Sequence, residues 1–134
     1  MMIWFGSVLA GAVLAFVVGA IWYGLLFGGA AASLSPAYAE AATPQASTLA
    51  FEALRCLGLA AALAVLIRWI GIESLSGSLL LALLVWAGFQ AAGLAGAVVH
   101  EGYPAKLYAI HAGDALAKAV VASLSIAFLT TRFG

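Results

Sequence analysis

Four blocks of apolar residues, each long enough to cross a bilayer, follow one another along the chain. They run over Ile3–Phe27, Leu49–Ile70, Ser78–Val99 and Leu107–Leu129. A helix rises about 1.5 Å per residue, so about 22 residues reach roughly 33 Å and exceed a hydrocarbon core of about 30 Å. Leu, Ala and Val dominate the blocks without the period-two alternation of a membrane β-barrel. The pattern therefore predicts four membrane-spanning helices.

The segments between the blocks predict how these helices are arranged. The first linker, residues 28–47, is long, rich in Ala and Ser, and carries a single charge, Glu40, which predicts that it lies on the membrane surface. The second, 71–77, and the third, 100–106, are short, and Gly102 and Pro104 favour a turn in the latter. Short linkers make consecutive helices antiparallel neighbours. We therefore expect an all-α, single-domain bundle of four transmembrane helices in antiparallel hairpins.

Composition and charge narrow the class of protein. Of the 134 residues, 66% are hydrophobic and 7% are charged. This number of charged side chains is too small to cover the surface of a water-soluble domain. The formal net charge is zero, so nucleic-acid binding has no electrostatic footprint and the expected surroundings are a lipid bilayer. Arg68 and Arg132 flank the spans on one side and Lys106 on the other, which predicts that both termini are cytoplasmic.

Small residues recur at every fourth position in three of the predicted spans. Such stripes let helix backbones approach closely in lipid, where no hydrophobic effect drives helices together. The favoured interpretation is packing within the bundle, and the alternative is that one stripe faces another copy or a larger membrane complex. The stripes are Gly11, Ala15 and Gly19; Gly88, Ala92 and Gly96; and Ala109, Gly113 and Ala117.

The fourth span carries three polar residues on one face. His111, Asp114 and Lys118 are spaced by three and four residues, so Asp114 and Lys118 can pair along the helix. A single charge near mid-membrane costs about 3 kcal/mol on insertion scales, so this face should avoid lipid. A structural ion pair is the favoured interpretation, and a polar path in an oligomeric transporter or channel subunit is the alternative.

The second span carries a further possible pair, Glu52 and Arg55. They lie one to two turns inside the predicted helix, where an arginine can extend toward the interface, so an interfacial anchor is the favoured interpretation. The alternative is a buried network with the fourth span. A difference in depth between Glu52 and Lys118 argues against a direct contact.

The third linker and its surroundings offer metal-ligand types without a metal motif. His100, Glu101 and His111 are the weak candidates, and they lack the HExxH or Cys/His spacing of known sites, so we expect no metal. The favoured interpretation is that His100 and Glu101, together with Lys106, are polar residues that cap a tight turn at the membrane surface. No cofactor motif is present. The interfacial aromatics expected to fix helix depth are Trp4, Trp22, Tyr23 and Trp69.

Several segments resemble a known family. The run Phe16–Tyr23, followed by Leu26-Phe27-Gly28, is similar to the first helix of the bacterial membrane family named domain of unknown function 1761. Trp86 and Phe89, then Glu101–Leu107 and Ile110–Gly113, are similar to its later segments. The family pattern has an acidic residue before the Ala-Gly of the fourth helix, where this chain has His111.

The resemblance implies a small multi-pass protein of a bacterial inner membrane, and it implies no activity. From the residues, the first hypothesis is a non-enzymatic module that packs against itself or a larger complex. The second is the transporter or channel subunit that uses His111, Asp114 and Lys118. The third is a membrane-embedded enzyme acting on a lipid or quinone, with His100, Glu101 and His111 at the interface.

Overall fold

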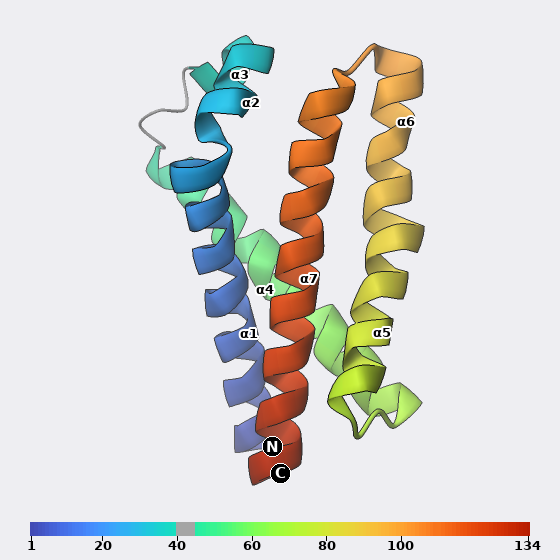
Figure 1. The fold of residues 1–134 in the computed structure, drawn as a ribbon. Helices are drawn as coiled ribbons and strands as arrows, with labels where there is room; N and C mark the ends of the chain where they lie inside the picture. The colour runs from blue at the N-terminus through green and yellow to red at the C-terminus, as the bar shows by residue number, and fades with distance from the viewer. Residues whose placement is uncertain (40–44) are drawn as a thin grey trace.

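The chain is helical throughout almost all of the part described by its computed structural model, residues 1–39 and 45–134 (Figure 1). Four helical stretches are long and apolar enough to cross a membrane: Met2–Leu26, Ala46–Ile70, Leu75–Glu101 and Ala105–Phe133. No strand occurs in these described ranges. The predicted all-α architecture with four spans is therefore confirmed.

Two of the spans contain a π-helical segment. The helix α1 (Met2–Ile21) continues directly into η1 (Trp22–Leu26). The third span runs as α5 (Leu75–Val85), η3 (Trp86–Ala91) and α6 (Ala92–Glu101). Such segments are rare and are frequent at functional sites. Each begins at a tryptophan.

The first linker is partly helical. It forms α2 (Gly28–Leu34) and α3 (Pro36–Ala39), which lie together at the end of the bundle opposite the termini (Figure 1). Residues 40–44 of this linker lie outside the described residues. The expected position of the linker on the membrane surface stays a prediction.

Glycines end the helices at both tight turns. Gly71 after α4 (Ala46–Ile70) and Gly102 after α6 have φ of 74° and 66°. These left-handed conformations favour glycine, because it has no Cβ to clash with the preceding carbonyl. The side-chain oxygen of Ser74 then accepts a hydrogen bond from the backbone N–H of Gly77 at 3.1 Å and caps α5.

The last helix, α7 (Ala105–Phe133), is the centre of the packing. It lies against α1 and α4, and α5 packs on another side of it. Small buried residues let these helices meet closely, notably Ala15, Ala60 and Ala122, which are completely buried. Figure 1 shows α4 running obliquely behind α1 and α7, and beginning below the level of α2 and α3. Both termini lie at the other end of the bundle (Figure 1).

Candidate functional site

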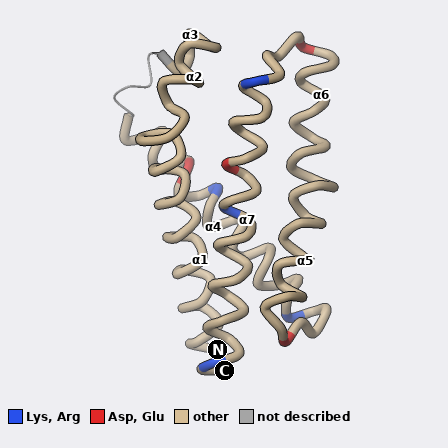
Figure 2. The backbone as a smooth tube through the Cα atoms, in the orientation of Figure 1, with Lys and Arg blue, Asp and Glu red and all other residues tan. Residues whose placement is uncertain are grey.

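Charged residues gather at three levels of the bundle. Figure 2 shows basic and acidic positions at both ends and a separate group at mid-height on α4 and α7. The mid-height group consists of Glu52, Arg55, Asp114 and Lys118, which we call the charge cluster. The side chains of Lys118 and Asp114 are only 7% and 9% exposed. A bilayer tolerates charges at such depth only when they are paired or face a polar cavity.

The charge cluster is a chain of ion pairs that joins two helices. Nζ of Lys118 lies 2.8 Å from Oδ2 of Asp114, one turn earlier on α7. Lys118 also donates to Oε1 of Glu52 on α4. The other oxygen of Glu52, Oε2, lies 2.8 Å from Nη1 of Arg55. Two acids and two bases alternate along this chain, so its formal charge is zero.

The expectation that Glu52 and Lys118 lie too far apart in depth for contact is wrong. Because α4 begins below α2 and α3 and then crosses obliquely (Figure 1), its second turn reaches the mid-height of α7. Glu52 is thus part of an interhelical network and more than an interfacial anchor. The guanidinium of Arg55, in contrast, points outward, with 64% of its side chain exposed.

A glycine of α1 makes room for the charge cluster. A Cβ added to Gly19 would lie 2.6 Å from Cε of Lys118 and 3.5 Å from Oδ1 of Asp114. The α1 backbone therefore covers the aliphatic stem of the lysine directly. Two turns earlier in the same stripe, a Cβ added to Gly11 would lie 3.2 Å from Cδ1 of Ile126. The stripe of the first span, Gly11, Ala15 and Gly19, is buried against α7.

His111 lies one turn from Asp114, toward the end of the bundle that carries α3, within a group of tyrosines. The hydroxyl of Tyr23 is hydrogen-bonded to Nδ1 of His111. The rings of Tyr23, Tyr38 and Tyr103 have centroids 5.6, 5.1 and 6.0 Å from the imidazole. Burial raises the pKa of the Tyr38 and Tyr103 phenols, which lie outside the spans. These two hydroxyls therefore remain neutral hydrogen-bonding groups at physiological pH.

Two tryptophans hold α7 on either side of His111. The indole N–H of Trp22 donates to the carbonyl oxygen of Ile110 at 3.0 Å, and that of Trp86 donates to the carbonyl oxygen of Ala112 at 2.7 Å. Each tryptophan is the first residue of a π-helical segment, η1 or η3. The two irregular segments thus converge on one turn of α7.

The sequence did not predict that aromatic side chains of the first span would be hydrogen-bonded to α7. Trp22 and Tyr23 are predicted from the sequence to be interfacial aromatics, whereas both side chains make hydrogen bonds to α7 inside the bundle. The available signal was the motif carried by the family resemblance, which includes both Trp22 and Trp86. Of the other aromatics, Trp69 is 81% exposed, and Trp4 is half-buried near the termini.

The remaining small-residue stripes differ in their surroundings. In the third span Gly88 and Ala92 are exposed, and a Cβ added to Gly88 or Gly96 would meet nothing within 4 Å. In the fourth span, on α7, Ala109 is exposed and Ala117 is half-buried. Gly113 is in tight contact, because a Cβ there would lie 2.6 Å from the ring of Trp22.

The proposed metal-ligand types are not brought together. His100 and Glu101 are exposed at the end of α6, as is Lys106 at the start of α7, while His111 is hydrogen-bonded to Tyr23. Among the described residues, no three His, Cys, Asp or Glu side chains are grouped so that they could hold a metal ion.

The arrangement as a whole is that of a small four-span helical membrane protein with a buried, charge-neutral cluster between its second and fourth spans. The family described as protein of unknown function (DUF1761) matches residues 7–127. The chain belongs to this family, in agreement with the resemblance noted in its sequence. Comparisons with curated proteins and with solved structures gave no match.

Proposed function

We propose that this protein is a non-enzymatic membrane module that assembles with a second copy, or with a larger membrane complex, through its third span. The observation that supports the proposal is the unoccupied small-residue face of that span. Gly88 and Ala92 are exposed, and there is open space beside Gly88 and Gly96. The equivalent face of the first span, at Gly11 and Gly19, is filled by α7.

The position of the third span in the bundle supports the same proposal. Within an 18-residue apolar stretch of the third span only 11% of the residues are buried, compared with 44% in the corresponding stretch of the fourth span. Helices associate in lipid through close backbone contact at small residues. A second helix can approach Gly88 and Gly96 in this way, because a Cβ added at either position would meet nothing within 4 Å.

The charge cluster supports a structural role over transport or catalysis. Lys118 is bound to carboxylates from both its own helix and α4, and the cluster has no net formal charge. Paired charges of this kind tie helices together, and each cation of the cluster contacts a carboxylate. His100 and Glu101 are exposed, and among the described residues they belong to no group of three metal-ligand side chains, so the structure adds no support to the enzyme hypothesis.

For the localisation we propose the inner membrane of a bacterium, with both termini in the cytoplasm. The family resemblance supports the first part. The second is supported by Arg68 and Arg132 near the end of the bundle that carries the termini, compared with Lys106 near the other end.

The assembly proposal is tested by gentle extraction from the native membrane and native mass spectrometry. We expect either a multiple of the 13.6 kDa chain or the chain together with a foreign subunit. Gly88→Leu combined with Gly96→Leu should weaken that assembly by about tenfold or more, because the bulky side chains hold the helices apart. The matched control is Gly58→Leu, at an exposed glycine of α4 that also has nothing within 4 Å. A single-chain mass for the wild type, or equal assembly of both variants, would contradict the proposal.

A further inference from the structure

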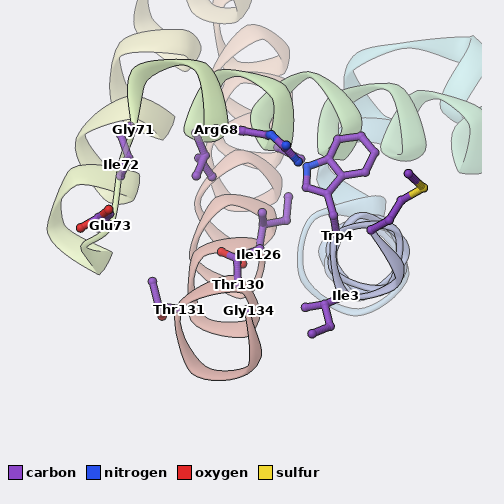
Figure 3. A pocket seen from close by; sticks show the side chains of 13 residues that line it. Ile3, Trp4, Arg68, Gly71, Ile72, Glu73, Ile126, Thr130, Thr131 and Gly134 are labelled. Atoms are coloured by element: carbon purple, nitrogen blue, oxygen red, sulfur yellow. The ribbon is translucent and has the colours of Figure 1, made fainter.

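An open recess lies at the end of the bundle that carries the termini (Figure 3). It is formed by the beginning of α1, the end of α4, the turn that follows α4, and the end of α7. Its volume is about 710 Å³, within the range of small-molecule sites. The residues that line it and are used below are Ile3, Trp4, Ile67, Arg68, Glu73 and Ile126.

Two hydrogen-bond donors in the recess have no acceptor. The indole Nε1 of Trp4 is buried and has no hydrogen-bond partner. Arg68 has no carboxylate within ion-pair distance among the described residues. Figure 3 shows the guanidinium of Arg68 pointing toward the indole of Trp4. Buried polar groups in proteins are almost always paired, so the buried indole N–H of Trp4 indicates an acceptor supplied from outside the chain. Arg68 is exposed, and its cation is available to the same acceptor.

The chemistry of the donors indicates an anionic oxygen ligand. A guanidinium binds two oxygens of a phosphate in a fixed geometry, and an indole N–H adds a single directed donor. Both belong to helices at the point where their spans end, since Arg68 lies two residues before the end of α4 and Trp4 in the first turn of α1. This is the level of lipid headgroups, where Arg and Trp are enriched.

The rest of the lining distinguishes a lipid from a free phosphate ion. Ile3 is 43% exposed and gives the recess an apolar surface above the buried Ile67 and Ile126, which a free ion would not use. Glu73 lies across the recess from Trp4 (Figure 3), so the site offers one cationic and one anionic side chain. A headgroup that carries both a phosphodiester and an ammonium matches this pattern, whereas a purely anionic headgroup would be repelled by Glu73.

We propose that the recess binds a phospholipid of the phosphatidylethanolamine type. The phosphodiester oxygens accept hydrogen bonds from the Arg68 guanidinium and the Trp4 indole. The ammonium of the headgroup faces the Glu73 carboxylate, and an acyl chain runs along the exposed side chain of Ile3. This site is separate from the charge cluster and from the third-span face, and it does not depend on the assembly proposal.

The test is native mass spectrometry of the delipidated full chain in detergent, titrated with phosphatidylethanolamine, phosphatidylglycerol or inorganic phosphate. We expect a one-lipid adduct with phosphatidylethanolamine, which Arg68→Gln weakens by about tenfold, as expected from the loss of a charge-assisted hydrogen bond. Trp4→Phe, which keeps the ring and removes the donor, should weaken it by about threefold. The matched control is Arg132→Gln, a cation near the same end that does not line the recess.

A second variant tests the orientation of the headgroup. Glu73→Gln removes the anion, so the preference for phosphatidylethanolamine over phosphatidylglycerol should fall, while total lipid binding is retained. Equal binding by Arg68→Gln and Arg132→Gln would overturn the site. So would displacement of the lipid by inorganic phosphate, which would assign the recess to a free anion, or the absence of any adduct. Thermal unfolding of each variant, expected to match the wild type, separates loss of the site from loss of the fold.

Discussion

At the scale of single residues, Lys118 has the most demanding position in the protein. Its ammonium contacts carboxylates on two helices, and its aliphatic stem lies beneath the backbone of Gly19. An ion pair of this kind contributes little net stability compared with apolar residues of the same shape, but removing one partner leaves a charge without compensation. The contribution of Lys118 to the stability of the fold therefore depends on Asp114 and Glu52 being ionised beside it.

We predict that Lys118→Met destabilises the fold by about 3–5 kcal/mol, because it leaves the buried Asp114 carboxylate unpaired and Glu52 with Arg55 alone. The unfolding free energy can be measured by denaturant titration in mixed micelles. The control is Arg55→Gln, which removes the other cation bound to Glu52 and should cost less than about 1 kcal/mol, since that side chain is largely exposed. Equal losses in the two variants would show that burial does not govern the cluster.

At the scale of elements, the contact between η1 and α7 combines a hydrogen bond with steric fit. The ring of Trp22 is fixed by its bond to the carbonyl oxygen of Ile110 and lies directly over Gly113. A fixed ring cannot move aside as a flexible side chain would. Gly113 is therefore required for close approach, although alanine is the better helix former by about 1 kcal/mol.

Gly113→Ala should destabilise the protein by about 1–3 kcal/mol, since the new methyl group overlaps the indole ring. The same change at Gly58, which meets nothing within 4 Å, should leave stability unchanged or raise it by up to about 1 kcal/mol. Midpoints of thermal unfolding, followed by tryptophan fluorescence, measure both. The two substitutions would have the same sign only if the indole moved away at no cost.

The elements also show where sequence reasoning was sufficient and where it failed. Long apolar blocks predicted the four spans, because membrane insertion depends on local composition. The contact between Glu52 and Lys118 escaped prediction, because it depends on the oblique course of α4, which no local pattern encodes. Likewise, small residues recur at every fourth position in both the first and the third span. Only the packing of α7 distinguishes the filled face of the first span from the open face of the third.

At the scale of the whole molecule, the two ends of the bundle differ. The end with the termini carries Arg68 and Arg132 together with the recess, and the opposite end carries Lys106 and the short helices α2 and α3. Basic residues near the ends of spans are retained on the cytoplasmic side during insertion. The orientation predicted in this way depends on two basic residues at one end and one at the other, so it can be tested directly.

We expect single cysteines to report this orientation in a Cys56→Ser background. Lys106→Cys should react with a membrane-impermeant maleimide in intact spheroplasts, while Glu73→Cys should react only after permeabilisation, because it lies at the end with the termini. Both positions are exposed in the fold. The reversed labelling pattern would place the termini outside the cytoplasm.

The spacing within the charge cluster has a consequence for biosynthesis. Translation proceeds from the N-terminus, so the helix that carries Glu52 enters the bilayer before Lys118 has been synthesised. Glu52 already has Arg55 three residues away in its own helix, and Asp114 has Lys118 four residues away in the other. The charges in the interior of each span are therefore already balanced when the insertion machinery releases the helix into the bilayer, and the interhelical contact forms afterwards between two neutral ion pairs.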